Sequence, residues 1–282
     1  MELKTRQYTQ ETGLLQEKHV LIIGCGEIGR SIMRHFIQAG IRELTMVDAA
    51  SDGQGKSKVF AAQAEAEMLD SSVRFHPWRT TFDKHKAPQL LRGKHIAVDA
   101  ASSPDTALLL EEACADAGLA IVSGIVQSWQ LQIIVSAPHS KTLQRFYRNV
   151  PSKINPITYS FAYSALTSLM AAEAVKYLLG TQTEAINHVC RLNLKSLDFK
   201  KFDPDSPALH VQNLCIHLTY STGKKTLSIP AQTTVRQLIQ QFEPEDVYVV
   251  VNGTFIDETQ YDEALFQNGD MVLMRRNVCV GG

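Results

Sequence analysis

The fold of this chain is decided by residues 19–48, HVLIIGCGEIGRSIMRHFIQAGIRELTMVD. Residues 20–23 form an apolar, β-branched run that is too short for a helix, which predicts a buried parallel strand. A glycine-rich turn follows, and apolar residues then recur at helical spacing as far as Gly40, a typical helix stop. Residues 44–47 predict a second strand. The stretch is therefore expected to form one βαβ unit.

Nucleotide binding is the function that this unit favours. Gly24, Gly26 and Gly29 form a G-x-G-x-x-G turn, which lets the backbone approach a phosphate at the start of the helix. Asp48 ends the second strand, where an acid can bind ribose hydroxyls. The motif alone does not choose between nucleotides, and tight packing of a strand against a helix is the alternative explanation.

Composition limits the class of protein. A chain of 282 residues with 44% hydrophobic residues has room for two soluble domains. No apolar run approaches a membrane span, and the polar start MELKTRQYTQETG does not resemble a signal peptide, so a cytoplasmic location and no membrane partner are expected. A net charge of -1 argues against nucleic acid as the main partner.

The cysteines predict neither disulfides nor zinc. There are five of them, scattered and without a C-x-x-C pair. His188 with Cys190, and Cys215 with His217, alternate as strand residues do, so packing is the favoured explanation. No metal ligand was assigned from these patterns.

An α/β alternation continues after Asp48 and predicts a doubly wound, mostly parallel sheet. A helix is expected at 59–69, strands at 73–76, 96–99 and 120–123, and a helix from Pro104. A further strand at 130–135, antiparallel in this interpretation, precedes a long helix at 159–179 and a closing hairpin at 189–194 and 197–202.

The composition changes at residues 203–207, DPDSP, where two prolines interrupt both periodicities. We expect a nucleotide-binding domain at 1–202, a linker at 203–210 and a small α+β domain at 211–282. In the last of these, strands are predicted at 214–220, 226–229, 247–251 and 271–274, with a helix from Thr233 or Thr234 to Phe242. The sequence ends in Gly281-Gly282.

These residues resemble two known families. The first domain is similar to the ThiF/MoeB/E1 adenylyltransferases, and the second to the ThiS/MoaD sulfur carriers, ubiquitin-like β-grasp proteins that end in Gly-Gly. The resemblance implies a Rossmann-like first domain and covers nearly the whole chain. Its second-domain motifs are residues 249–253, VVVNG, residues 268–270, NGD, and the terminal VGG.

The resemblance also implies site residues. The glycine turn and Asp48 would bind ATP, and Lys58, in the segment GKSK, would contact its phosphates. Arg6, in TRQY, would act in the site of a dimer partner, so a homodimer is implied. Asp99 would belong to the catalytic edge, and Gly282 would be the carboxylate that is activated.

The family pattern is broken at several points. No Asn-Arg pair follows the ribose acid, and the family's D-C-T-D-N segment is replaced by DAASS at 99–103, which removes the usual Mg²⁺ ligand. Asp99 or Asp105 could substitute for that ligand. Both zinc C-x-x-C pairs are missing, and so is the cysteine expected within 137–155.

Three functional hypotheses follow. In the first, the chain uses ATP and Mg²⁺ to adenylate Gly282, in cis or in trans, so that a sulfur donor can form a thiocarboxylate for a downstream biosynthetic enzyme. In the second, the first domain is a degenerate scaffold and another enzyme activates the tail. The third is an NAD-dependent oxidoreductase. Cys279, three residues from the end, either takes part in sulfur chemistry or only contacts the channel that the tail enters.

Overall fold

The computed structural model describes residues 10–101, 103–127, 129–148, 159–206, 213–220, 222–230, 233–242, 247–264, 266 and 269–276. The chain divides into two compact units, Met1–Ser206 and Pro207–Gly282. The division falls inside the segment in which the sequence predicts a linker. No helix in the described ranges is long and apolar enough to cross a membrane.

An eight-stranded sheet forms the centre of the first unit, with strand order β3-β2-β1-β4-β5-β6-β7-β8. The five strands from β3 to β5 run parallel, and β6 to β8 continue antiparallel. The strands are β1 (His19–Ile23), β2 (Glu43–Val47), β3 (Arg74–Trp78), β4 (Ile96–Asp99), β5 (Ile121–Gln127), β6 (Gln130–Ser136), β7 (Val189–Asn193) and β8 (Asp198–Phe202). The prediction of a doubly wound α/β sheet with an antiparallel extension is confirmed.

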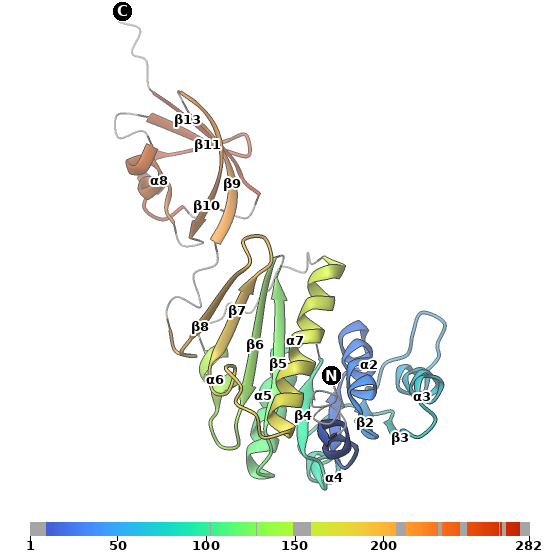
Figure 1. Cartoon of the computed structure of the whole chain (residues 1–282). Helices are drawn as coiled ribbons and strands as arrows, with labels where there is room; N and C mark the ends of the chain where they lie inside the picture. The colour runs from blue at the N-terminus through green and yellow to red at the C-terminus, as the bar shows by residue number, and fades with distance from the viewer. Residues whose placement is uncertain are drawn as a thin grey trace, which may run out of the picture. The chain divides into compact units, whose positions relative to one another are not determined.

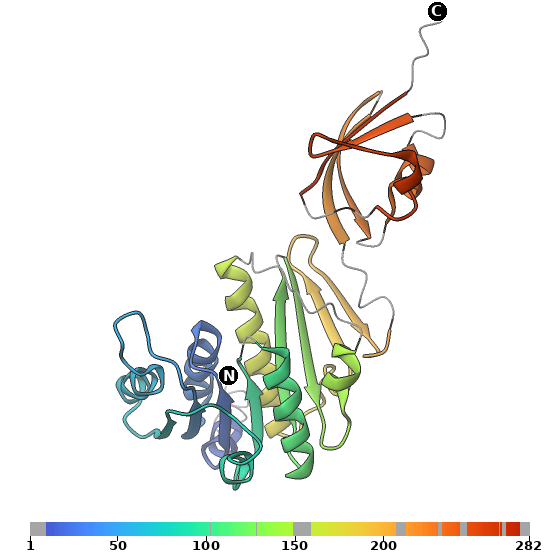
Figure 2. The ribbon, with the colours of Figure 1, turned by 180° about the vertical axis from the view of Figure 1, so that it is seen from behind.

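Helices cover both faces of this sheet. Figure 1 views the face on which α2 and α7 pack, and Figure 2 shows the opposite face with α5. The helices are α2 (Glu27–Ala39), α3 (Lys58–Leu69), α4 (Ala87–Leu91), α5 (Pro104–Asp116), α6 (Thr142–Tyr147) and α7 (Ser160–Leu178). Apolar side chains of α2 and α7, including Phe36, Leu166 and Met170, are buried against the strands. The short helices α4 and α6 were not predicted, because five or six residues carry too little periodicity.

The second unit is a five-stranded sheet with one helix packed on it. Its strand order is β10-β9-β13-β11-β12, and β13 pairs parallel with β9 in the interior of the sheet. The elements are β9 (Asn213–Tyr220), β10 (Gly223–Pro230), α8 (Val235–Phe242), β11 (Val247–Val251), β12 (Thr254–Ile256), the 3-10 turn η2 (Glu258–Gln260) and β13 (Met271–Arg276). Leu238 of α8 is buried among Ile216, Val249 and Met274 of the sheet.

Two details of this unit differ from the sequence prediction. The hairpin between β9 and β10 is tighter than expected, since Tyr220 pairs with Gly223 and only two residues separate the strands. The three-residue strand β12 was missed, because such a short segment shows no alternation that a sequence pattern could reveal.

Candidate nucleotide site

The glycine turn lies where β1 ends and α2 begins, at the carboxyl edge of the parallel strands. Gly24 has φ 106 and donates from its amide to Val47 O over 2.8 Å, which joins the end of β1 to the end of β2. A Cβ on Gly24 would lie 2.5 Å from Ala100 O, and a Cβ on Gly29 would lie 1.9 Å from Gly24 O. Both positions therefore require glycine for close packing of the turn.

Gly26 differs from its two neighbours in the motif. It is the N-cap of α2, and a Cβ added to it would meet no atom within 4 Å. Open space on this side of the turn is what a phosphate needs to approach the unpaired amides at the start of α2. The packing explanation thus accounts for Gly24 and Gly29 but leaves Gly26 to a ligand.

Asp48 connects the glycine turn to the loop that follows β2. Its Oδ2 accepts from the Cys25 amide over 2.8 Å, and its Oδ1 accepts from the Ala50 amide over 2.7 Å. Each carboxylate oxygen has a second lone pair, so both can still accept from ribose hydroxyls. The side chain is half-buried, which leaves it reachable from the open side of the turn.

Lys58 is the first residue of α3, as the sequence predicts within one residue, and its amide donates to Ala50 O over 3.2 Å. Its charge lies close to the glycine turn. Burial raises the pKa of the Cys25 thiol to about 12, Asp48 raises it further, and Lys58 and Arg30 act in the opposite direction. The structure therefore brings Lys58, Asp48 and the glycine turn together.

Ser57, the N-cap of α3, has a buried hydroxyl for which the described residues supply no hydrogen-bond partner. Buried hydroxyls are nearly always paired, so an orphan beside Lys58 and a helix start indicates a missing ligand. The sequence interpretation did not single out Ser57. Its signal was the departure of GKSK from the family's G-K-P-K.

Asp99 ends β4, the strand next to β1, but its side chain is engaged with β5. Ser123 Oγ donates to Oδ2 over 2.8 Å, and the Ala101 amide donates to Oδ1 over 3.1 Å. The carboxyl is 5% exposed, and this burial raises its pKa to about 6 against the effect of both hydrogen bonds.

Tyr147 of α6 extends this group. Its phenol is hydrogen-bonded to Ser123, and burial together with the nearby charge of Asp99 raises the pKa of the phenol. The sequence gave no indication of this contact, since 24 residues separate Tyr147 from Ser123 and 48 separate it from Asp99. Arg6 and Gly282 lie outside the described residues.

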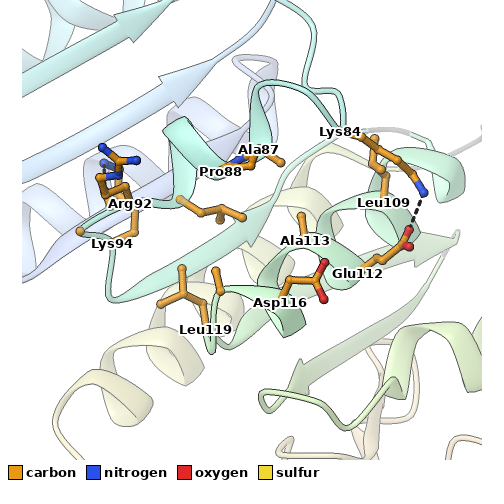
Figure 3. A pocket seen from close by; sticks show the side chains of 13 residues that line it. Lys84, Ala87, Pro88, Arg92, Lys94, Leu109, Glu112, Ala113, Asp116 and Leu119 are labelled. Carbon is orange, nitrogen blue, oxygen red and sulfur yellow. Dashed lines mark hydrogen bonds and ion pairs between the residues drawn. The ribbon is translucent and has the colours of Figure 1, made fainter.

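The largest well-formed cavity among the described residues lies elsewhere in the first unit. It has a volume of about 460 Å³ and is lined by α4, α5 and the turns that precede β4 and β5. Figure 3 shows Leu109, Ala113 and Leu119 at its apolar side and the Lys84–Glu112 ion pair at its rim. These turns lead into the amino ends of the strands, so the cavity is remote from the glycine turn.

Residues 6–212 match the ThiF family. The chain belongs to this family. Among curated relatives of this ThiF-family chain, the sulfur carrier protein adenylyltransferase of Thermus thermophilus is 24% identical over 215 residues, which cover 66% of this chain and 79% of the relative. The adenylyltransferase and sulfurtransferase MOCS3 of Dictyostelium discoideum is 26% identical over 180 residues, and only 42% of its length is covered.

Solved structures agree on the fold of this ThiF-family unit. E. coli MccB with ATP has a TM-score of 0.59 and 15% identity, with 71% of this chain and 68% of that chain covered. PaaA has the same TM-score at 13% identity. Identities this low establish the architecture of the first unit and leave its chemistry to the residues of the site.

Proposed function

We propose that the chain binds ATP at the glycine turn and adenylates the C-terminal glycine of a sulfur carrier. The observation that carries the proposal is the group formed by the open side of Gly26, the carboxylate of Asp48 and the start of α3 with Lys58. It offers amides and a cation to phosphates and an acid to a ribose. Relatives named as sulfur carrier adenylyltransferases support this choice of reaction.

In the reaction, an oxygen of the glycine carboxylate attacks the α-phosphorus of ATP, and the bond to the β-phosphate oxygen breaks. The products are an acyl adenylate and pyrophosphate. A sulfur donor of the persulfide type can then attack the acyl carbon and displace AMP, which leaves a thiocarboxylate once the S–S bond is reduced. Lys58 and the amides of α2 would stabilise charge on the phosphates, where one such contact contributes about a hundredfold or more in rate.

The second unit is proposed to be the carrier. A hairpin, one packed helix and an interior strand parallel to the first strand are consistent with a ubiquitin-like β-grasp. Its last strand, β13, leads to residues 277–282, NVCVGG, which end in two residues without β-carbons. Such a tail fits a narrow channel, so Gly282 is the proposed substrate.

The Mg²⁺ that the family implies does not fit the described residues well. Asp99 accepts two hydrogen bonds and has a raised pKa, and Asp105 is exposed on the first turn of α5. This favours a second candidate function, in which the first unit binds nucleotide but another enzyme activates the tail. The two candidates predict different products.

Incubation of the full chain with ATP and Mg²⁺ separates them. If the chain adenylates its own tail, intact mass increases by one AMP, pyrophosphate exchanges into ATP, and deletion of Gly281 and Gly282 abolishes both signals. Lys58→Met should lower exchange at least about a hundredfold. Lys56→Met, on the same loop, is the matched control and should retain it.

The alternatives give distinct results. An unchanged mass with saturable ATP binding would support the scaffold hypothesis, and thiocarboxylation should then require an added activating enzyme. Saturable NADH binding without a response to ATP would contradict the proposal and favour an oxidoreductase.

A further inference from the structure

Three side chains that bind metals in many proteins meet at the amino ends of β1, β2 and β3. His19, Glu43 and His76 each place one ligand atom within 4.8 Å of the other two. Strand register explains the meeting, because His19 pairs with Glu43 across β1 and β2, and His76 pairs with Thr45 across β2 and β3. The three strands lie side by side in Figure 1.

The distances are unusual for hydrogen bonds. His19 Nδ1 and His76 Nε2 both lie 3.3 Å from the same atom, Glu43 Oε1. A charge-assisted hydrogen bond is normally about 2.7–2.9 Å long. Ligands of a tetrahedral zinc ion, by contrast, lie about 3.3 Å apart when each is about 2.0–2.1 Å from the metal. Both measured edges therefore fit shared coordination better than direct pairing.

The surrounding contacts orient these atoms. His19 Nε2 is 2.8 Å from Thr45 Oγ1, so a proton on Nε2 leaves the Nδ1 lone pair directed at the cluster. Arg74 donates to Glu43 Oε2 over 2.6 Å and leaves Oε1 available. Second contacts of this kind on a histidine and a carboxylate are typical of metal ligands.

The charges near the cluster act in both directions. Burial lowers the pKa of His19 to about 4, with Lys94 next in effect, His76 and His95 acting in the same direction, and Glu43 opposing them. His19 is thus neutral at neutral pH, which suits a ligand. The positive charges of Arg74 and Lys94 oppose a divalent ion, so binding weaker than at an all-cysteine zinc site is expected.

We propose that His19, Glu43 and His76 bind a zinc ion, with water in the fourth position. The ion would link the first three strands of the chain at the edge opposite the glycine turn. Four residues of β1 separate His19 from Ile23, or about 13 Å. The site is therefore distinct from any metal that accompanies ATP, and its role is to stabilise the sheet.

Zinc competition with a chromophoric chelator tests the proposal on the full, tag-free chain after metal removal. We expect one zinc per chain, a higher melting temperature with zinc, and a tetrahedral absorption spectrum with Co²⁺. Glu43→Gln and His76→Ala should weaken binding more than a hundredfold. Thr45→Val, which removes the contact to His19, should weaken it about tenfold to a hundredfold.

His85→Ala is the matched control, because His85 is an exposed histidine of the same unit outside the cluster. It should bind zinc as the parent chain does. Folding of each variant is checked by circular dichroism, and His76, with a side chain 45% exposed, can be removed without opening the core. Absence of stoichiometric zinc binding, or equal affinity in His76→Ala and His85→Ala, would overturn the proposal.

Discussion

At the scale of single residues, Asp48 holds the glycine turn through two amides and has lone pairs left for a ribose. Asp48→Ala should weaken ATP binding at least about tenfold, since a hydrogen bond to a charged group contributes about 1.5–3 kcal/mol. Calorimetric titration measures this. Asp70→Ala, which removes the contacts of Asp70 to Ser72 at the far end of α3, is the control and should bind normally.

Asp99 predicts a particular dependence of stability on pH. Its folded-state pKa is raised from the ordinary 3.8 to about 6, so its contribution to stability is fully present below pH 3.8 and is lost as pH rises through 6. The shift corresponds to about 3 kcal/mol in the free energy of unfolding.

Asp99→Asn should remove this loss. Relative to the parent chain, the variant should gain stability between pH 4 and pH 7.5, as measured by urea denaturation at both values. Asp105→Asn changes an exposed carboxyl on α5 and should leave the pH profile unchanged. Parallel profiles for Asp99→Asn and the parent chain would contradict the assignment of a buried, proton-binding carboxyl.

At the scale of elements, the turn between β1 and α2 separates folding from binding. Gly29→Ala places a Cβ 1.9 Å from Gly24 O and should cost about 1–3 kcal/mol, or several degrees in melting temperature. Gly26→Ala meets no atom and should cost about 1 kcal/mol or less, yet it should weaken ATP binding by filling the open side of the turn. Thermal denaturation and calorimetry, run on both variants, distinguish the two effects.

Elements encoded by local pattern were predictable. The bounds of β4 and the start of α5 at Pro104 match the sequence prediction, because a buried run and a proline at the first helical position are local signals. Contacts that depend on strand register were not predictable. His19, Glu43 and His76 are 24 and 33 residues apart, and the search for zinc ligands considered only cysteine pairs and alternating neighbours.

One interpretation of a side chain was wrong in the same way. Arg145 was expected on a solvated helix face, but it donates to Asp203 and Asp205 over 2.8 and 2.6 Å. These acids lie at the end of the first unit, where the sequence showed only a break in periodicity. An ion pair across 58 residues leaves no trace in a pattern of 3.6 or two residues.

At the scale of the whole molecule, complementation tests whether the tail is activated in cis or in trans. A Lys58→Met chain keeps its tail but has an impaired site, and a chain without Gly281 and Gly282 keeps its site but has no tail. Neither should be adenylated alone. If activation occurs in trans, the mixture should show one AMP on the Lys58→Met chain by intact mass, whereas cis activation leaves the mixture inactive.

The resemblance that assigns Arg6 to a partner's site also predicts a homodimer with a two-fold interface. Light scattering at micromolar concentration should then give twice the chain mass of 31.3 kDa. Arg6→Ala should lower pyrophosphate exchange without dissociating the dimer. A monomer that retains full exchange would contradict this role for Arg6.

The parallel pairing of β9 with β13 has a mechanical consequence for the second unit. The unit begins with β9 and its last strand is β13, and His217, Leu218 and Thr219 pair in register with Met271, Val272 and Leu273. A pulling force applied between the start of β9 and the end of β13 acts along both strands in opposite directions. It loads these backbone hydrogen bonds together, in shear, instead of opening them one after another. Tension from a protein that grips the Gly-Gly end is therefore resisted by the interior of the sheet, and the carrier can be held by its tail without being unravelled.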